Sequence, residues 1–447
     1  MPTYRIVTLG CKLNQADAAA LEARLRRLGL ERADDADAGS PEHDPGTDLV
    51  VLNTCTVTAA ADREARQIAR RLRRRNPRAT LIATGCYAER DASALRAIAG
   101  IDHVVGLRDQ AACVASLAAA ALGLTIDREA RELGPFGATE GCDPLPDPTE
   151  RTRALLKIQD GCDLRCSYCV IPSVRGGSRS LPPDLVLRRI ERLAEAGYRE
   201  IVLTGVNTGD YGRDLDPPLG LHHLLERVLR LPGVGRVRLN SLEPRTVTAE
   251  VIDCLARGSG RIARHLQIPL QSGSDGVLAR MRRPYRSADY ARVVTSLREA
   301  IPAIGLGADL IVGFPGETEE EFETTVRFVA SSPLNYLHVF SYSSRPGTWA
   351  ASLPAPVPPP VVKERSARLR ALGRALSLRF RRSFLDRELP AVTLREVRPD
   401  GRLRALTDNF IDVGLDPDGR PAGPLMNRLV TARITAATDD DTFAVVA

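Results

Sequence analysis

Short apolar runs alternate with longer amphipathic stretches over the first 125 residues. The apolar runs end at Leu9, Leu52 and Ala83, and stretches with helical spacing follow at residues 15–28, 59–75 and 92–99. Strands that alternate with helices form parallel sheets, because each helix carries the chain back to the same end of the sheet. The pattern predicts an α/β domain over residues 1–125, with a parallel sheet wrapped by helices.

A second region, from residue 151 to about 350, repeats this alternation six times. Strand-like runs occur at residues 155–158, 201–204, 237–241, 265–269, 307–312 and 337–342, with helical stretches at 184–196, 221–230, 249–256, 288–299 and 319–330. Six units are fewer than the eight of a complete barrel, so this region is predicted to be an open, partial (β/α)6 barrel. As in a complete barrel, the site is expected at the C-terminal mouth of the strands.

Segments of different composition separate and follow these two regions. Residues 126–150 are rich in glycine, proline and aspartate, which indicates a linker. Residues 361–382 have the pattern of one arginine-rich amphipathic helix, so the second region extends to residue 383. Residues 384–447 contain short alternating runs broken by Pro-Asp-Gly at 399–401 and 417–419. They predict a small C-terminal all-β barrel.

The formal charge of the 447-residue chain is +6, and its basic residues are almost all arginine. Planar guanidinium groups suit phosphate contacts, so the composition permits nucleic-acid binding without requiring it. Met1 leads directly into a strand-like run instead of a secretory signal. The longest apolar run, residues 111–126, is shorter than a membrane span and is expected to be a packed helix. We therefore expect no membrane partner.

Three cysteines, Cys162, Cys166 and Cys169, have C-x3-C-x2-C spacing. Three thiolates can hold three irons of a [4Fe–4S] cube and leave the fourth iron open to a small molecule. A zinc site or a structural cysteine cluster is the alternative, but zinc sites usually need four ligands and favour C-x2-C pairs. The spacing resembles that of radical S-adenosylmethionine (radical SAM) enzymes, in which the open iron binds the methionine moiety of the cofactor.

Each predicted strand of the first region is followed by a cysteine, at Cys11, Cys55 and Cys86. Ligands of open α/β sheets bind at the carboxyl ends of the strands, so these cysteines are expected to converge although they are distant in sequence. They predict a second three-cysteine cluster with another open iron. The alternative is three buried thiols in tight turns, because cysteine is common in protein cores. Reduced thiolates need a reducing compartment, which predicts a cytoplasmic protein.

With both cysteine triplets and this order of domains, the whole chain resembles the radical SAM methylthiotransferases. It is most similar to the branch that modifies threonylcarbamoyl-adenosine (t6A) in tRNA. The supporting strings are TLGCKLNQ at 8–15, NTCTVT at 53–58, TGCYA at 84–88, KIQDGC at 157–162, LTGVNTG at 203–209, IPLQSGS at 268–274 and VGFPGET at 312–318. Through TDNFIDV at 407–413, the tail resembles a TRAM module, an RNA-binding appendage.

This resemblance implies a Rossmann-like N-terminal methylthiotransferase domain, a radical SAM core and a TRAM-like RNA-binding barrel. It also implies conversion of t6A at position 37 of tRNA to its 2-methylthio derivative. A radical from SAM would activate the adenine C2–H bond, and sulfur insertion and methyl transfer would follow. The implied cofactors are two [4Fe–4S] clusters and S-adenosyl-L-methionine. The implied partners are the tRNA anticodon stem-loop, an electron donor such as flavodoxin or ferredoxin, and a sulfur source.

The resemblance also assigns roles to individual residues. The cluster ligands would be Cys162, Cys166 and Cys169 for the SAM cluster, and Cys11, Cys55 and Cys86 for the other. Tyr168 is the aromatic residue expected to lie against the adenine of the cofactor. Five further positions would contact the cofactor: Gly205, Asn207, Ser241, Glu243 and Gly313. Simple packing is the alternative for Tyr168, and ordinary turns are the alternative for the glycines. Four arginines after the fourth barrel strand are candidates for RNA binding: Arg280, Arg282, Arg283 and Arg286.

Two other functions remain open from the sequence. The same chemistry could act on isopentenyl-adenosine in tRNA or on an aspartate of a ribosomal protein. A non-enzymatic iron–sulfur protein that binds RNA or transfers electrons is the third hypothesis. The open coordination predicted for both triplets argues against this last reading, because an electron-transfer cluster usually has all four irons ligated.

Overall fold

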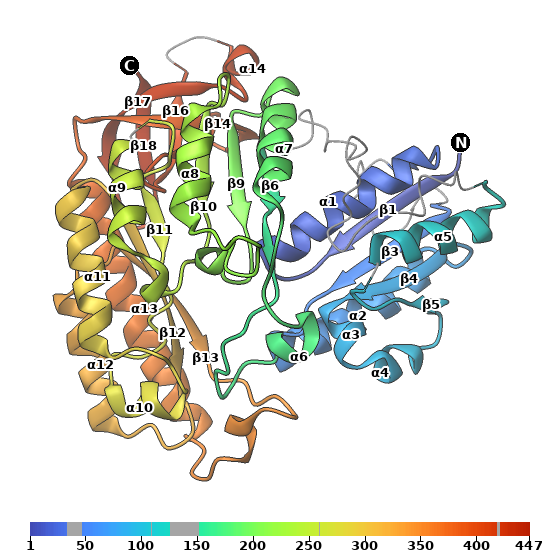
Figure 1. The fold of residues 1–447 in the computed structure, drawn as a ribbon, viewed down its shortest axis with the longest axis horizontal. Coiled ribbons are helices and arrows are strands. Elements are labelled where there is room, and N and C mark those ends of the chain that lie inside the picture. Colours follow the sequence, from blue (N-terminus) through green and yellow to red (C-terminus); the bar gives the residue numbers. More distant parts are fainter. Residues whose placement is uncertain (34–46, 109, 126–151, 259, 418–420) are drawn as a thin grey trace.

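The computed structural model describes residues 1–33, 47–108, 110–125, 152–258, 260–417 and 421–447 (Figure 1). A five-stranded sheet, a partial barrel built from two three-stranded sheets, and a closed five-stranded barrel follow one another along the chain. The predicted mixed α/β architecture is confirmed. The predicted linker at residues 126–150 lies outside the described residues, and the domain limits stay a prediction.

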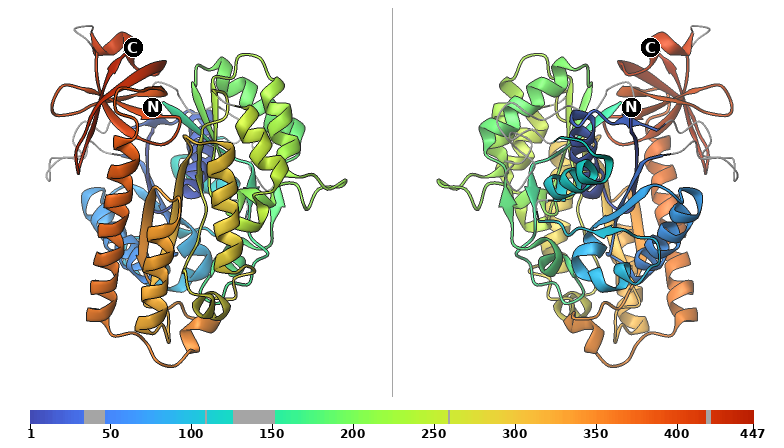
Figure 2. Two further views of the ribbon diagram at one scale, coloured as in Figure 1. Left: turned by 90° about the vertical axis from the view of Figure 1, so that its left-hand side faces the viewer. Right: turned by 90° about the vertical axis from the view of Figure 1, so that its right-hand side faces the viewer.

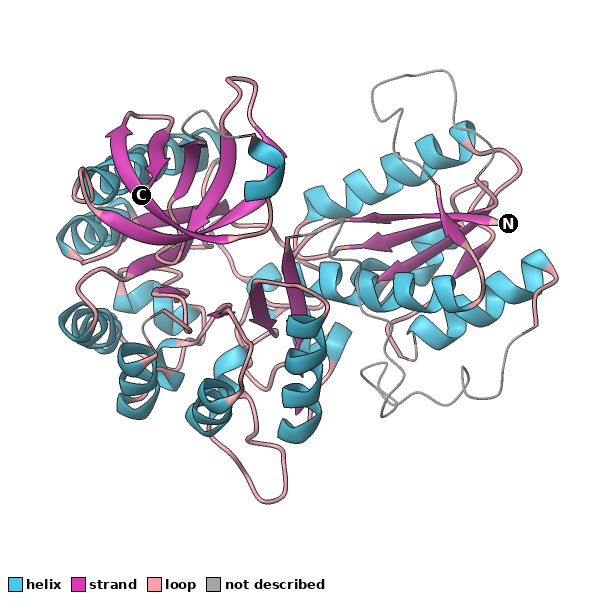
Figure 3. Ribbon diagram, turned by 90° about the horizontal axis from the view of Figure 1, so that it is seen from above, coloured by secondary structure: helices cyan, strands magenta, loops and turns pink. Residues whose placement is uncertain are grey.

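The N-terminal sheet has the strand order β2-β1-β3-β4-β5, and all its neighbouring strands are parallel. Its strands are β1 (Thr3–Thr8), β2 (Glu31–Arg32), β3 (Leu49–Thr54), β4 (Thr80–Gly85) and β5 (His103–Val104). Its helices are α1 (Lys12–Arg27), α2 (Ala59–Arg75), α3 (Cys86–Arg90), α4 (Ala92–Arg96) and α5 (Gln110–Leu122). Helices cover both faces of the sheet, as Figure 3 shows from above.

The central strand β3 explains this layering. All six of its residues are buried, and successive side chains point to opposite faces of the sheet. Val50 and Leu52 belong to one apolar cluster with residues of α2, whereas Leu49 and Val51 belong to another with residues of α1 and α5. A strand that is buried on both faces has a continuous apolar run in its sequence, and β3 has such a run.

The second part contains the parallel sheets β10-β9-β6 and β11-β12-β13. Its strands are β6 (Arg153–Lys157), β9 (Glu200–Thr204), β10 (Arg236–Leu239), β11 (His265–Gln267), β12 (Gly305–Val312) and β13 (Tyr336–Ser341). Its main helices are α7 (Pro183–Glu195), α8 (Leu221–Arg230), α9 (Ala249–Arg257), α11 (Ser287–Ala300) and α12 (Glu319–Ser331). The amide of Leu242 donates to the Gln267 carbonyl at 3.1 Å and joins the two sheets into one open barrel.

The two faces of the barrel strands differ in chemistry. On β10, Val237 and Leu239 point outward into the large apolar core that the surrounding helices share. The alternate position Arg238 therefore faces inward, as does Asn240 just beyond the strand. The same alternation puts further polar residues on the inner face: His265, Gln267, Asp309 and His338. The inside of this barrel is therefore lined by polar side chains, whereas a complete barrel is usually filled by apolar side chains.

A long helix leads from the partial barrel to the C-terminal barrel (Figure 2). This helix is α13 (Pro359–Arg382), which packs along β13. The closed barrel has the order β14-β15-β16-β18-β17, with β14 (Glu388–Val397), β15 (Leu403–Thr407), β16 (Asp412–Asp416), β17 (Leu429–Ala437) and β18 (Thr442–Val446). In the described part of the chain, no helix has both the length and the apolar character needed to cross a membrane.

A buried ion triad attaches the C-terminal barrel to the partial barrel. Glu200 accepts from Arg236 Nε at 2.7 Å and from Arg238 Nε at 3.0 Å, and all three residues are almost completely buried. The remaining guanidinium N–H groups donate to carbonyls of the C-terminal barrel: those of Pro390, Leu406, Thr407 and Asp408. Burial alone raises the pKa of Glu200, but the two arginines outweigh it and hold this pKa at about 2.

An aromatic contact completes this junction. Phe410 has a φ of 74°, a strained conformation for a side chain of this size, and its ring stacks on His265 at 4.1 Å between centroids. His265 Nε2 also makes a 2.7 Å hydrogen bond with the Tyr336 hydroxyl. Burial lowers the pKa of His265 well below its ordinary value, and the nearby charges of Arg238 and Lys12 add to this shift.

This buried histidine predicts a pH dependence of stability. In the native protein His265 stays neutral, whereas in the unfolded chain it binds a proton below about pH 6.5. Stability should therefore be fully present above this pH and decrease as the pH falls below it, by up to about 1.4 kcal/mol per pH unit. Urea unfolding from pH 8 to 5.5 measures this slope, and His265→Gln, which cannot titrate, should flatten it.

The exposed His223 on α8 offers a control, because His223→Gln should leave the slope unchanged. Equal slopes in the native protein and His265→Gln would contradict the prediction. Only the slopes are compared, since the substitution itself changes the packing against Phe410.

Candidate iron–sulfur and substrate site

The three N-terminal cysteines follow the carboxyl ends of neighbouring strands. Cys11 precedes the first residue of α1, Cys55 follows β3, and Cys86 begins α3 directly after β4. Because β1, β3 and β4 are adjacent and parallel, their carboxyl ends lie on one edge of the sheet. In Figure 1 this edge faces the partial barrel.

Two glycines allow the backbone to bring these cysteines together. Gly10 and Gly85 each precede a cysteine, and both have a φ of 93°, which side-chain-bearing residues rarely adopt. A Cβ on Gly10 would lie 2.6 Å from the Cys55 sulfur, so only glycine fits this close approach. Asn14 accepts from the Cys86 thiol at 3.5 Å and donates to the carbonyls of Leu9 and Thr54, at 2.9 Å each.

The second triplet lies in the loop after β6. The amide of Cys162 donates to the Gly176 carbonyl at 3.0 Å, and that of Cys169 donates to the Cys166 carbonyl at 3.1 Å. The Cys169 sulfur accepts from the amide of Ile171 at 3.4 Å. These bonds fix the backbone of the loop and leave its three half-buried sulfurs able to act as ligands.

Arg283 lies beside this triplet. Its side chain is almost completely buried, and Nη1 donates to the Cys166 sulfur at 3.1 Å while Nη2 pairs with Glu243. The sequence placed Arg283 among the candidates for RNA binding, but its guanidinium is directed toward the cysteines and Glu243. Such a cation favours the negative charge of a thiolate.

The sulfurs of both triplets suit iron. Burial raises the pKa of Cys86 and of Cys169 to about 12, and that of Cys162 to about 11, so cluster assembly must release these protons. Within the described ranges, no three His, Cys, Asp or Glu side chains are grouped closely enough to bind one metal ion. A [4Fe–4S] cube does not need three ligands around a single ion, because each thiolate binds a different iron of the cube. Three thiolates in each triplet therefore suit a cube that keeps one iron open.

The two triplets are neighbours. Cys86 packs against Val170 and Val174 in one small buried cluster, and Val170 directly follows Cys169. This contact joins the edge of the N-terminal sheet to the cysteine loop of the barrel. A substrate held between the two parts would therefore be within reach of both.

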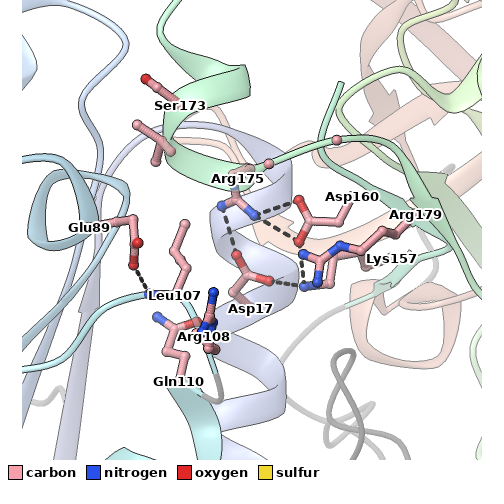
Figure 4. Close-up of a pocket in the computed structure, with 13 residues that line it drawn as sticks. Asp17, Glu89, Leu107, Arg108, Gln110, Lys157, Asp160, Ser173, Arg175 and Arg179 are labelled. Carbon is pink, nitrogen blue, oxygen red and sulfur yellow. Dashed lines mark hydrogen bonds and ion pairs between the residues drawn. The ribbon is translucent and has the colours of Figure 1, made fainter. Parts of the chain in front are cut away.

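An ion network fixes this arrangement (Figure 4). Arg175 donates to Asn14 Oδ1 at 2.7 Å and to Asp17 Oδ2 at 2.9 Å, and pairs with Asp160 at 3.1 Å. Lys157 Nζ bridges the same two carboxylates, at 2.5 and 3.2 Å. The two carboxylates, Arg175 and Lys157 line a cavity of about 420 Å³ between α1 and the barrel. Burial alone raises the pKa of Asp160, but Lys157 and Arg175 outweigh it and hold this pKa at about 2.

The turn after β9 fits a role in cofactor binding. Gln159 Oε1 accepts from the Asn207 amide at 2.9 Å, and a Cβ on Gly205 would lie 2.6 Å from the same oxygen. Asn207 donates to Asp210 at 2.5 Å, but its own side-chain oxygen is buried without a protein partner. This oxygen can accept from the amino group of a bound methionine moiety.

The other predicted cofactor residues are near the same mouth. Ser241 donates to Gln267 at 3.3 Å, and Glu243 pairs with Arg283. Tyr168 packs against the buried cluster that includes Met281 and Phe314. Gly313 has a φ of 78°, and its amide donates to Glu317 at 2.8 Å in the turn after β12. Their roles toward the cofactor stay predictions.

The remaining RNA candidates differ in exposure. Arg280 is bound to Glu321 at 2.7 and 3.0 Å, whereas Arg282 is exposed and stacks over Trp349 at 4.6 Å. Arg286 is exposed at the start of α11. Arg282 and Arg286 therefore present charge to the surface near the cysteine loop, and their contact with RNA stays a prediction.

Lys12 enters the barrel from the N-terminal part. Its Nζ donates to Asn240 Oδ1 at 3.3 Å and lies 5.8 Å from the centroid of the Phe410 ring. Burial lowers its pKa to about 8, and the positive charges of Arg153 and Arg238 contribute. No carboxylate of the described residues pairs with its ammonium group.

Sequence reasoning had assigned no role to Asn14, Asp17, Gln159, Asp160 or Arg175. Asn14 and Asp17 are polar residues on a buried helix face, spaced by three positions, and this is the only signal the sequence offers. Their partners come from a distant segment, so no local pattern shows the pairing.

Two family signatures match the chain, that of the Radical SAM superfamily over residues 156–329 and that of the uncharacterized protein family UPF0004 over residues 3–106. The chain is 39% identical to the threonylcarbamoyladenosine tRNA methylthiotransferase MtaB of Bacillus subtilis, over 92% of this chain and 90% of that protein. It is 34% identical to a tRNA-2-methylthio-N(6)-dimethylallyladenosine synthase of Acidothermus cellulolyticus, over 99% and 85%.

A third relative is the ribosomal protein uS12 methylthiotransferase RimO of Desulforudis audaxviator, which is 36% identical over 86% of this chain and 83% of that protein. Among solved structures, the radical SAM methyltransferase TsrM of Kitasatospora setae superposes with a TM-score of 0.55 at 19% identity. This superposition covers 78% of this chain and 77% of that one, and supports the fold alone.

Proposed function

This chain belongs to the radical SAM methylthiotransferases, and from this membership we propose that it converts t6A at position 37 of tRNA to 2-methylthio-t6A. The observation that carries the proposal is the pair of adjoining cysteine triplets, one at the edge of the N-terminal sheet and one at the barrel mouth. Long matches to relatives named for this reaction support the same target, with 39% identity in the Bacillus subtilis protein.

Each of the two parts of the chain would hold one of the two clusters. Cys162, Cys166 and Cys169 would hold the cluster that binds SAM, and Cys11, Cys55 and Cys86 would hold the other. When bound, these groups supply an electron for cleavage of SAM and a site for the sulfur that is inserted. Asn207 would accept from the cofactor's amino group through its unpaired oxygen. The contact of Cys86 with Val170 keeps both triplets beside one substrate position.

The inner face of the barrel favours threonylcarbamoyl over a prenyl group. Asn240, Gln267 and Asp309 on this face, together with Lys12, offer hydrogen bonds and charge. A threonylcarbamoyl group has polar atoms that can add hydrogen bonds to these side chains, whereas a dimethylallyl group is a hydrocarbon and would displace water from them without offering any hydrogen bond in return. This chemistry supports t6A over the target named in the dimethylallyladenosine synthases.

The reaction also needs partners. We propose the tRNA anticodon stem-loop as substrate, with the C-terminal barrel and the exposed Arg282 and Arg286 in contact with RNA. Cleavage of SAM needs an electron donor, for which a flavodoxin or ferredoxin is suited, and the inserted sulfur needs a source. These requirements and the six thiolates, which need a reducing compartment, favour the cytoplasm as the location that we propose.

Mass spectrometry of tRNA nucleosides tests the proposal. A strain lacking the gene should lose 2-methylthio-t6A and accumulate t6A, and expression of the intact gene should restore it. Purified, anaerobically reconstituted protein should modify an anticodon stem-loop that carries t6A but not one that carries dimethylallyl-adenosine. Loss of the dimethylallyl product with an unchanged t6A profile would contradict the assignment.

A further inference from the structure

Lys12 occupies an unusual position between the two halves of the site. It directly follows the cluster cysteine Cys11, and its ammonium group reaches Asn240 at 3.3 Å on the inner face of the barrel. Asn240 directly precedes Ser241, a residue expected to hold SAM, and donates to Thr204 at the end of β9 at 3.0 Å. The side chain thus connects the residue after one cluster cysteine with the strand ends of the barrel.

The other charged groups around Lys12 already have ion-pair or hydrogen-bond partners. Arg236, Arg238 and Arg153 all pair with Glu200, at 2.7, 3.0 and 3.5 Å. Asp309 accepts from Gln267 at 2.5 Å and from His338 at 3.1 Å. Among the described residues of this inner face, Lys12 is the one cation that has no carboxylate partner.

The inner face near Lys12 is also accessible. His338 and Phe340 share one face of β13, and Phe340 is 47% exposed although its neighbours Leu337 and Val339 pack into the apolar core. A half-exposed aromatic ring on the inside of a barrel suits stacking by a nucleobase. The inner face that Lys12 enters therefore has an exposed part that a nucleotide can reach.

The target nucleotide of the proposed function carries a matching charge. Its threonylcarbamoyl group ends in a carboxylate, whereas adenosine and its dimethylallyl derivative have no charge on the base. A lysine is a compact cation that binds a carboxylate through strong charge-assisted hydrogen bonds. The ammonium of Lys12, which has no carboxylate partner among the described residues, has the chemistry and the position to bind this group.

We propose that Lys12 determines substrate specificity by binding the threonyl carboxylate of t6A between the two clusters. This inference rests on the proposed function and adds to it the residue that recognises the modification. Asn240 would orient the ammonium through its 3.3 Å hydrogen bond, and Phe410, whose ring lies 5.8 Å from it, would limit its movement. Substrates without the carboxylate would leave the cation unpaired and would bind weakly.

The test compares two substrates with three enzymes. The substrates are an anticodon stem-loop with t6A and the same stem-loop with the carboxylate converted to its methyl ester. The enzymes are anaerobically reconstituted full-length native protein, Lys12→Gln and Lys12→Arg. Lys12→Gln should raise the KM and the Kd for the acid roughly 100-fold, with kcat changed by only a few-fold. It should bind the ester as the native protein does, and Lys12→Arg should restore most of the affinity for the acid.

Binding is measured by fluorescence anisotropy without added SAM, so this readout does not depend on turnover. Lys363→Gln is the matched control, because it removes an exposed lysine from α13 and should change neither substrate's affinity. Equal effects of Lys12→Gln on acid and ester, no effect on either, or a loss of iron would each overturn the proposal. If the native protein fails to methylthiolate the t6A stem-loop, the proposed function itself is wrong, regardless of how the Lys12 substitutions change substrate binding.

Discussion

Replacing Cys11, Cys55 and Cys86 together by alanine is expected to abolish methylthiolation while the cleavage of SAM continues. The iron content should fall from about eight to about four per chain, because each [4Fe–4S] cluster contains four irons. The second triplet, in the loop after β6, keeps its backbone hydrogen bonds and its own cluster. The variant should therefore still release 5′-deoxyadenosine from SAM in the presence of dithionite.

Iron analysis, product assays and nucleoside mass spectrometry check this prediction on one anaerobic preparation. The complementary variant, in which Cys162, Cys166 and Cys169 are alanine, should lose both SAM cleavage and methylthiolation. Cys113→Ala removes an exposed cysteine outside both triplets and should retain iron and activity. The two-cluster account fails if the N-terminal variant keeps all its iron or still forms the methylthio product.

Replacing Glu200 by glutamine is expected to destabilise the protein by about 3–5 kcal/mol, because it leaves Arg236 and Arg238 as buried charges without an anion. The guanidinium groups of these arginines also hold four carbonyls of the C-terminal barrel. If the guanidinium groups lose their fixed positions, the C-terminal barrel should become less tightly held. The amide hydrogens of β14 and β15 should then exchange faster. Urea unfolding and hydrogen exchange with mass spectrometry measure the two effects.

Glu396→Gln is a matched control for this substitution. Glu396 pairs with Arg404 at 2.5 Å, but both side chains are exposed, by 63% and 41%. An exposed ion pair contributes less than about 1 kcal/mol, so this variant should remain close to the native protein. Similar losses in Glu200→Gln and Glu396→Gln would show that the buried triad does not hold the junction.

Local sequence patterns predicted most of the secondary structure because they depend on neighbouring residues. The helix expected at residues 59–75 is α2 (Ala59–Arg75), and Thr58 caps it by accepting from the Ala61 amide at 3.1 Å. In the string TDNFIDV at 407–413, the strand β16 begins only at Asp412. Residues 408–411 instead form the turn that docks on the partial barrel, where Asp408 binds Arg264 at 2.6 Å.

Buried polar contacts could not be predicted in this way. Arg283 is one of four arginines that the sequence placed near RNA, but in the structure it binds the Cys166 sulfur and Glu243. Arg175, in a short helix after the cysteine loop, binds Asp17 of a different part of the chain. The charge of an arginine is visible in the sequence, but its burial and its partner depend on how distant segments pack.

The sequence alone determined the chemistry of this protein, because cysteine spacing within a loop and the alternation of strands and helices are local properties. The C-x3-C-x2-C triplet, the parallel sheets and the final β-barrel follow from such short-range patterns, and the other three cysteines are recognised by their place after three predicted strands. Only the tertiary structure decided that Cys86 packs against Val170, that Lys12 reaches Asn240, and that Glu200 joins two barrels. These contacts connect residues far apart in the chain, and the packing of whole domains brings them together.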